Sequence, residues 1–481
     1  MNATDLAYTT AADLARLIAT KKLSAVEVVG ATLARAQSSQ AVLNAFITIP
    51  ADRAMDAAKA ADAAVQRGDT LGALHGVPFT AKDLVNTRDV RTTFGSFVFE
   101  HNVPTADQVC VARLKQAGAI LVGKTTTPEF GHKALTESPL FGRTRNAWSA
   151  ERTSGGSSGG AAVACASGIA PLAISTDGGG STRIPAACNG VVGFKQTLGL
   201  VPHDTAPDAF GNVSYLDPTT RTVLDNALML AAMGGPHPSD PHSLHLKTDG
   251  LVAAARGEGD LTGVRMAWRA HLGNTAVDVE VLRLCRQAFD AFSDLKATVS
   301  ETNAAFEPAE PVFQVLWASL LNARYRRYVP EFGPRMSETL LRQMDAGLGV
   351  TGEQVLAAIF ARTAIYRQIQ TWFETADILV MPTLARTAVS IDHDFFADVT
   401  INNTPAGPAR RAWYPYTHPF NISGHPAISL PAGFHSDGLP VAIQLVGRHG
   451  EDALLLKAAA LFEKARPWVH RRPVLAGVDG V

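Results

Sequence analysis

"TSGGSSGGAAVACASGIAPLAISTDGGGSTR", residues 153–183, decides the fold of this chain. Two glycine-rich loops, "SGGSSGG" at 154–160 and "DGGGSTR" at 177–183, flank a single apolar unit. That unit predicts a helix, a turn and a buried strand. Glycine permits tight turns and close backbone approach, so the four glycines around Ser157 and Ser158 predict a site, with a flexible linker as the alternative.

Strands and helices alternate over most of the remaining chain. Apolar runs predict strands in "GVPFTAKDLV" (76–85), "GVRMAWRA" (263–270), "DILVMPT" (377–383), "HPAISLPAG" (425–433) and "LPVAIQLVG" (439–447). "VARLKQAGAILVGKTTTP" (111–128) predicts a helix, a glycine stop and a buried strand, and 277–292 and 454–465 have helical spacing. This alternation implies an α/β fold whose sheet is covered by helices on both faces.

The N-terminal segment, residues 1–70, is expected to be helical and to pack on the core. Thr10 and Ser24 are expected to cap two helices, and a third, Ala-rich helix is expected to end at Gly68. We expect one catalytic domain at 71–481, with a helical insertion around 305–376. Residues 390–416, with their Pro, Asn and Gly, are expected to be irregular.

Composition excludes several classes of protein. The 481 residues are 46% hydrophobic and 18% charged, with a formal net charge of −1, which argues against a nucleic-acid partner. No run reaches the roughly 18 unbroken apolar residues of a membrane span. The N-terminus lacks a signal-peptide pattern, so we expect a cytoplasmic protein. The four cysteines form no CxxC pair and are expected to be reduced thiols.

Neither glycine loop has the spacing of a nucleotide-binding loop. Gly160 is followed by two alanines where a P-loop has lysine, and GxGxxG is absent from both loops. The histidines of "GPHPSDPHSLHLK", residues 235–247, lie on a Pro-rich loop and not on one helix face. We therefore expect no metal and no cofactor.

Two serines compete for the role of nucleophile. "GGSSG" matches the GxSxG elbow with Ser157 at its centre, but that elbow needs a hydrophobic strand before the serine, and "NAWSAERTSGG" is polar. Ser181 follows a predicted strand and three glycines, whose bare N–H groups suit an oxyanion hole. Lys82, at the end of another predicted strand, can act as base if burial keeps it neutral. Ser157 would then pass the proton from Ser181 to Lys82.

These residues carry a resemblance to a known family. The run at 153–197 resembles the core of the amidase signature family, the amidohydrolases with a Ser–cis-Ser–Lys triad. "LHGVPFTAKD" (74–83), "LKQAGAILVGKTTTPEFG" (114–131), "FGRTRNAW" (141–148) and 421–448 are similar to its other landmarks. The resemblance covers nearly the whole chain and is closest to stand-alone bacterial amidases and acylamidases. It implies a large, mixed, mostly parallel central sheet covered by helices.

The resemblance also assigns roles, residue by residue. It implies that Lys82 is the catalytic lysine, that Ser157, after a cis Gly156–Ser157 peptide, is the bridging serine, and that Ser181 is the nucleophile. The oxyanion hole would be Gly178, Gly179, Gly180 and Ser181, and the bracing polar residues Ser158, Asp177 and Arg183.

Residues of the substrate pocket are also expected. Aromatic residues Trp317, Tyr325, Trp413, Tyr414 and Tyr416 are candidates to line it. Our set for the pocket is Phe130, His132, Gly155, Gly156, Trp317 and Trp413.

The implied activity is hydrolysis of a small amide or anilide through an acyl-enzyme, giving an acid and ammonia or an amine. The alternative is the glutaminase subunit of a tRNA-dependent amidotransferase. That subunit typically has "RQPA" where this chain has Arg183-Ile184-Pro185-Ala186, which weakens the alternative. A third hypothesis is a binding module that keeps an inactive hydrolase shell, against which the complete Lys82, Ser157 and Ser181 set argues. We expect a small-molecule amide as the partner, neither nucleic acid nor membrane, and a homodimer from the family's habit.

Overall fold

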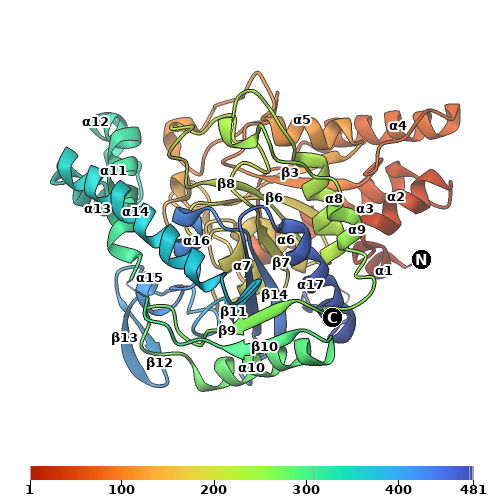
Figure 1. The fold of residues 1–481 in the computed structure, drawn as a ribbon. Coiled ribbons are helices and arrows are strands. Elements are labelled where there is room, and N and C mark those ends of the chain that lie inside the picture. Colours follow the sequence, from red (N-terminus) through yellow and green to blue (C-terminus); the bar gives the residue numbers. More distant parts are fainter. Residues whose placement is uncertain (1, 307, 476, 479–481) are drawn as a thin grey trace.

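The central feature of the computed structural model is a sheet of eleven strands (Figure 1). The structure describes residues 2–306, 308–475 and 477–478. In spatial order the strands are β1 (Phe46–Thr48), β3 (Ile120–Thr125), β2 (Pro78–Lys82), β6 (Leu172–Asp177), β8 (Tyr215–Thr220), β7 (Val192–Lys195), β14 (Ala427–Phe434), β15 (Pro440–Gly447), β11 (Ile378–Pro382), β9 (Arg265–Trp268) and β10 (Thr298–Glu301). The strands predicted around Lys82, in the apolar unit and near the C-terminus are confirmed.

The sheet is mixed, as predicted. Parallel pairing joins β3, β2 and β6 on one side and β11, β9 and β10 on the other. Between them β8, β7, β14 and β15 alternate in direction, and β1 adds an antiparallel edge. Parallel pairs are fewer than we expected, in part because β14 and β15 are joined by a short connection, which only antiparallel strands allow.

Helices pack on the faces of this sheet and extend beyond it (Figure 1). They are α1 (Ala3–Ala7), α2 (Ala11–Ala19), α3 (Ala25–Leu43), α4 (Ala51–Arg67), α5 (Val109–Gln116), α6 (Gly159–Ala166), α7 (Arg183–Asn189), α8 (Val223–Met233), α9 (Leu251–Ala254), α10 (Val279–Asp294), α11 (Glu310–Tyr325), α12 (Val329–Phe332), α13 (Glu338–Leu348), α14 (Gly352–Trp372), α15 (Ala409–Ala412), α16 (His418–Ser423) and α17 (Asp452–Ala465). The predicted α/β fold with helices on both faces is confirmed. In Figure 1, α11 to α14 lie at the opposite side of the molecule from α2 to α4.

The predicted helix ends follow local chemistry. Thr10 and Ser24 accept hydrogen bonds from the backbone N–H groups three residues later, and Ser24 completes a capping box with Glu27. Gly68 ends α4 in the left-handed conformation. These short-range signals are readable in the sequence because each depends on residues within one turn.

Two segments differ from expectation. Residues 46–48, within the N-terminal segment expected to be helical, form the edge strand β1, which pairs with β3. Residues 390–416, expected to be irregular, contain a hairpin of β12 (Asp398–Ile401) and β13 (Thr404–Pro408). Its turn is made by Asn402 and Asn403, both at positive φ, a conformation that asparagine tolerates. That 305–376, which forms α11 to α14, is an insertion into one catalytic domain stays a prediction.

Within the described residues, no helix combines the length and the apolar composition required to cross a bilayer. The central strands are fully buried, and β2 and β6 lie side by side with their carboxyl ends at the same edge. Functional groups of α/β proteins gather at such edges, and the next subsection begins there.

Candidate active site

The site starts where β2 and β6 end. Their register pairs Ala81 with Ile174, so Lys82, the last residue of β2, lies beside the last residues of β6. Side chains alternate along a strand, and consecutive residues of β6 accordingly serve different partners. Thr176 contacts Lys82, whereas Asp177 contacts Arg183.

Lys82 is fully buried among hydroxyl groups. Its Nζ lies 2.7 Å from Ser157 Oγ, 2.8 Å from Ser158 Oγ and 2.8 Å from Thr176 Oγ1. Burial lowers the pKa of Lys82 well below its ordinary value, and the carboxylates of Asp177 and Asp217 oppose that shift. Burial also raises the pKa of Asp217 well above its ordinary value. Burial therefore favours the neutral amine form of Lys82.

The hydrogen bonds around Lys82 set the role of each hydroxyl. The Ser158 hydroxyl donates to the Thr176 carbonyl at 3.2 Å, so Ser158 accepts from the amine. A neutral amine has two hydrogens and one lone pair. If Ser158 and Thr176 take the two hydrogens, the lone pair is left for the Ser157 hydroxyl. This arrangement suits proton transfer between Ser157 and Lys82.

The loop carrying Ser157 is tightly packed and is not a flexible linker. The Gly156–Ser157 peptide is cis, as the resemblance implies. A Cβ on Gly159 would lie 2.4 Å from Thr136 Oγ1, and one on Gly160 would lie 2.4 Å from Thr126 Oγ1. Only glycine fits at such distances. The chain then enters α6, whose N-terminus carries partial positive charge.

Ser181 lies beside this loop, at the start of a short turn into α7. Its backbone carbonyl accepts a hydrogen bond from the Ser158 N–H at 3.2 Å, and its side chain is half-buried on the wall of a pocket. Its hydroxyl makes no hydrogen bond with any residue that the structure describes, so the Ser157–Ser181 link of the expected relay is not formed in this state. Catalytic hydrogen bonds often tighten only when substrate is bound.

The glycines before Ser181 differ in what their amides do. Gly180, at φ +122°, donates its N–H to Asp177 Oδ1, and a Cβ there would lie 2.4 Å from Thr417 Oγ1. The Gly180 amide is therefore already in use, contrary to its expected place in the oxyanion hole. The amides of Gly178, Gly179 and Ser181 make no hydrogen bond within the described part of the chain. The Thr417 hydroxyl donates to the Gly179 carbonyl at 2.8 Å and fixes that peptide.

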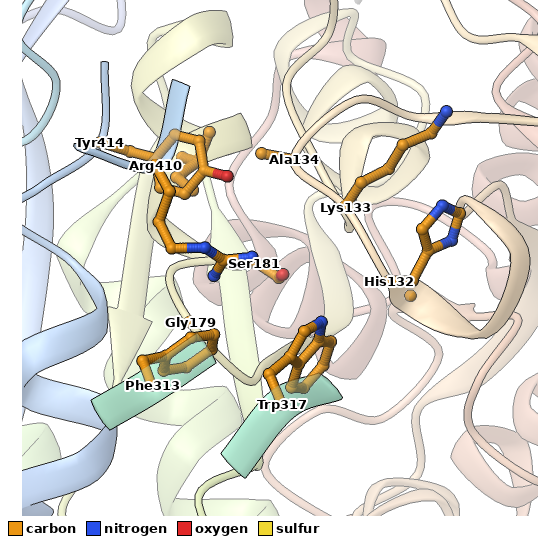
Figure 2. Close-up of a pocket in the computed structure, with 11 residues that line it drawn as sticks. His132, Lys133, Ala134, Gly179, Ser181, Phe313, Trp317, Arg410 and Tyr414 are labelled. Atoms are coloured by element: carbon orange, nitrogen blue, oxygen red, sulfur yellow. The ribbon is translucent and has the colours of Figure 1, made fainter. Parts of the chain in front are cut away.

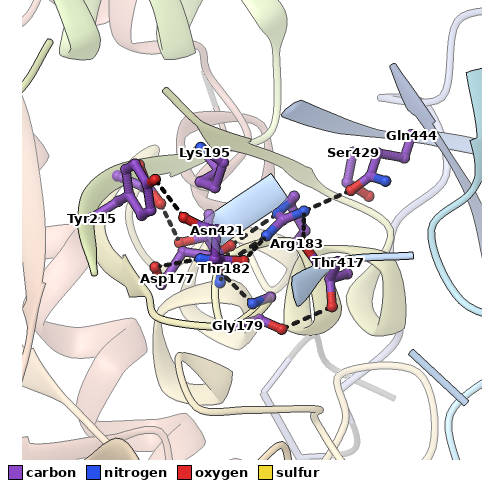
Figure 3. A network of polar contacts seen from close by, with 12 residues as sticks. Asp177, Gly179, Thr182, Arg183, Lys195, Tyr215, Thr417, Asn421, Ser429 and Gln444 are labelled. Carbon is purple, nitrogen blue, oxygen red and sulfur yellow. Dashed lines mark hydrogen bonds and ion pairs between the residues drawn. The ribbon is translucent and has the colours of Figure 1, made fainter. Parts of the chain in front are cut away.

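A buried ion pair braces the second glycine-rich loop, residues 177–183, called the glycine loop below (Figure 3). Arg183 Nε and Nη2 lie 3.0 and 3.1 Å from the two oxygens of Asp177, and neither side chain is exposed. The guanidinium also donates to the Thr417 carbonyl, Gln444 Oε1 and Asn421 Oδ1. Burial raises the pKa of Asp177, but the charge and hydrogen bonds of Arg183, with those of Asn421 and Gly180, outweigh it and lower the pKa to about 2.

Arg183→Met is expected to destabilise the fold strongly. The substitution leaves the Asp177 carboxylate buried without its cation, which costs about 3–5 kcal/mol of unfolding free energy. Arg16→Met is the matched control, because Arg16 pairs with Asp13 at 2.8 Å but both side chains are at least half exposed. That change is expected to cost no more than about 1 kcal/mol. Urea unfolding of both variants measures the difference, and equal losses would contradict the bracing role.

The pocket beside Ser181 has aromatic and cationic walls (Figure 2). Its lining residues are Gly131, His132, Lys133, Ala134, Gly179, Ser181, Ile184, Phe313, Trp317, Arg410 and Tyr414. They enclose about 290 Å³ free of atoms, part of it open to solvent. Phe313 and Trp317 come from α11 and stack at 5.6 Å between ring centroids. The pocket is therefore shared between the glycine loop and the helical segment at 305–376.

Two of the residues expected in the pocket, His132 and Trp317, line it. His132 is not a free base. Burial lowers its pKa to about 3, its Nδ1 lies 2.7 Å from the Glu129 carbonyl, and its Nε2 lies 2.7 Å from Thr339 Oγ1. The neutral ring therefore joins the loop to α13. His132 is therefore placed to line the pocket wall and not to act as a base.

The other four expected pocket residues lie elsewhere. Phe130 stacks on Tyr325 at 3.9 Å between centroids, within an apolar cluster under α11 and α13. Gly155 and Gly156 are covered by the backbones of Pro185 and Ala134, respectively. Trp413 is fully buried and donates its indole N–H to a backbone carbonyl, and the residue after it lines the pocket instead.

Sequence analysis missed several residues of the site: Thr176, Thr417, Asn421, Ile184, Phe313 and Arg410. Thr176 had a usable signal, since it precedes Asp177 at the end of a strand predicted to lie near Lys82. Ile184 directly follows Arg183 in the sequence, and the remaining four come from segments that only the fold brings together.

Comparison with known proteins gives consistent results. The family model described as Amidase matches residues 27–456. An acylamidase of Rhodococcus erythropolis is 37% identical, over 98% of this chain and 98% of its own length. One of the glutamyl-tRNA(Gln) amidotransferase subunits, from Moorella thermoacetica, is 34% identical, over 98% of this chain and 99% of its own length. The crystal structure of a bacterial aryl acylamidase of the amidase signature family superposes with a TM-score of 0.89 at 29% identity, covering 96% of this chain and 97% of that one.

Proposed function

This chain belongs to the amidase signature family, and we propose that it hydrolyses small amides or anilides through an acyl-enzyme on Ser181. As a family member it is a hydrolase of amide carbon–nitrogen bonds. The roles of individual residues and the substrate class are the proposal. One observation carries it: a buried lysine, whose pKa burial lowers, lies 2.7 Å from Ser157 beside the loop that presents Ser181 to a pocket.

In the first half of the reaction, Ser181 Oγ attacks the amide carbonyl carbon. Its proton passes to Ser157 Oγ while the proton of Ser157 passes to the lone pair of Lys82. The Ser157–Ser181 hydrogen bond that this transfer needs is expected to form when substrate is bound. The protonated lysine then returns a proton by the same route to the leaving nitrogen, and the amine or ammonia departs.

Negative charge develops on the carbonyl oxygen during this attack. The amides of Gly178, Gly179 and Ser181 are the donors proposed to bind it, because the Gly180 amide is held by Asp177. Donors fixed before the reaction stabilise a developing charge without reorganisation. In the second half, water replaces Ser181 as the nucleophile and releases the acid with the same proton transfers.

The pocket walls favour a small substrate with an aromatic group. Phe313, Trp317 and Tyr414 offer ring surfaces to a substrate beside Ser181. Ile184 lines the pocket at the position where amidotransferase subunits typically have glutamine. An apolar wall at this position supports a stand-alone amidase. The expected homodimer and cytoplasmic location stay predictions.

A substrate panel tests the proposal. Acetanilide, acetamide, a peptide amide, an aryl carbamate and glutamine are compared by release of amine or ammonia from the purified chain. We expect acetanilide to exceed acetamide in kcat/KM by about 10-fold or more, because the ring gains burial against the aromatic walls. Glutamine hydrolysis that appears only with an added partner and tRNA would instead favour the amidotransferase alternative. Turnover of none of the five would overturn the proposal.

A further inference from the structure

Arg410 is a pocket residue that the proposed reaction leaves without a role. We propose that Arg410 binds a carboxylate of the substrate, so that the preferred amides carry a negative charge near the bond that is cleaved. This inference rests on the proposed function, because it concerns the substrate of the same pocket.

The contacts of Arg410 hold its guanidinium in place without using its donors. The guanidinium carbon lies 4.6 Å from the centroid of the Phe313 ring and 5.9 Å from that of Tyr414. Figure 2 shows the side chain extending from α15 toward Ser181. Within the described ranges, Arg410 donates no hydrogen bond and lies within ion-pair distance of no carboxylate. Arg183, the buried arginine behind the glycine loop, has its donors filled by protein oxygens instead.

The pocket holds no acid to balance this charge. None of its lining residues is Asp or Glu. Lys133, the other cation on the wall, is 3% exposed and pairs with Glu137 at 2.7 Å. Burial and the nearby charge of Glu310 raise the pKa of Tyr414. The Glu310 carboxylate accepts a hydrogen bond from Gln314 at 2.6 Å and makes no ion pair with Arg410 among the described residues. Among the residues that the structure describes, the wall beside Ser181 therefore carries one uncompensated positive charge.

A carboxylate is the group that fits this charge best. A guanidinium presents its N–H donors in a rigid planar fork that matches the two oxygens of a carboxylate. Half-burial against two aromatic rings makes such a pair stronger than one in open water. A neutral amide would leave these donors to solvent. The carboxylate can belong to the acyl part or to the amine part of the substrate, since both adjoin the scissile bond.

Matched substrate pairs test the inference and separate the two sources. For the acyl part, succinanilic acid is compared with the uncharged pentananilide; for the amine part, 4-acetamidobenzoate is compared with 4-methylacetanilide. We expect wild type to have a higher kcat/KM for the acid than for its neutral partner in at least one pair. Arg410→Met should lower that ratio roughly 30- to 100-fold, and Arg410→Lys should lower it less.

Arg411→Met is the control, because Arg411 is the next residue of the same helix, is exposed, and does not line the pocket. It changes the net charge equally and should leave the ratio unchanged. A ratio near one in wild type, or one that Arg410→Met does not alter, overturns the inference while neutral anilides still turn over. If no amide turns over, the proposed function itself fails. Should Arg410→Met not fold, as judged by circular dichroism, the wild-type ratios and Arg410→Lys decide.

Discussion

Replacing Ser181 with alanine is expected to lower kcat by about 10⁴-fold or more while leaving the fold intact. Without its hydroxyl no acyl-enzyme forms, and bound substrate can be attacked only by water. The side chain is half-buried at the pocket wall and makes no hydrogen bond with described residues, so its loss should alter the free energy of unfolding by less than about 1 kcal/mol. Steady-state anilide hydrolysis and urea unfolding measure the two effects.

Covalent labelling separates the two candidate nucleophiles. A serine-directed fluorophosphonate should modify Ser181 in the wild type, as located by peptide mass spectrometry, and should not modify the Ser181→Ala variant. In Ser157→Ala the label should still reach Ser181 but more slowly, because the proton has lost its route to Lys82. Labelling of Ser157 in the Ser181→Ala variant would identify Ser157 as the nucleophile and overturn the mechanism.

The positions of Lys82 and Asp177 were predictable from sequence because each residue ends a predicted strand. Lys82 closes an apolar run, and Asp177 closes another, so the α/β alternation alone places them at one edge of the sheet. The glycine loops were recognisable because close packing permits no side chain at positions such as Gly160. Features that depend on local chemistry or on close packing can therefore be recognised in short stretches of sequence.

The pocket was less predictable because its walls come from segments far apart in the chain. Phe313 lies in a segment predicted to be helical and Arg410 in one predicted to be irregular, and only the fold brings them to Ser181. The direction of a single amide was also beyond sequence reasoning. In the sequence Gly180 cannot be distinguished from Gly178 and Gly179, yet its N–H donates a hydrogen bond to Asp177 Oδ1. Contacts between residues far apart in the chain, such as Phe313 and Arg410, leave no local signal in the sequence.

Two buried basic residues near the 177–183 loop, Arg183 and Lys82, have different partners. Arg183 lies among the Asp177 carboxylate, two side-chain amide oxygens and one backbone carbonyl. Lys82 is surrounded by hydroxyls alone, which solvate an ammonium much less well than water does. The difference in partners therefore produces a fixed brace on one side of the glycine loop and a proton acceptor on the other.

Lys82→Met is expected to lower kcat by about 10⁴-fold, since the methionine has no lone pair to accept the proton of Ser157. In the wild type the same requirement sets the pH dependence. Activity should fall as pH drops through the pKa of Lys82, which burial holds well below its ordinary 10.5. The acidic limb of kcat/KM should accordingly lie far below pH 10.5, and a limb near that value would contradict a neutral lysine.

Unfolding measures the same ionisation without catalysis. Lys82 is neutral when folded and binds a proton on unfolding, so wild-type stability rises with pH between the folded pKa and 10.5. Lys82→Met has no such dependence. Its unfolding free energy minus that of wild type should therefore fall by about 1.4 kcal/mol for each pH unit within this interval. Ser181→Ala, equally inactive but with the lysine intact, should show a constant difference. A constant difference for Lys82→Met as well would mean that the folded protein keeps Lys82 charged, and that Ser181 has another base.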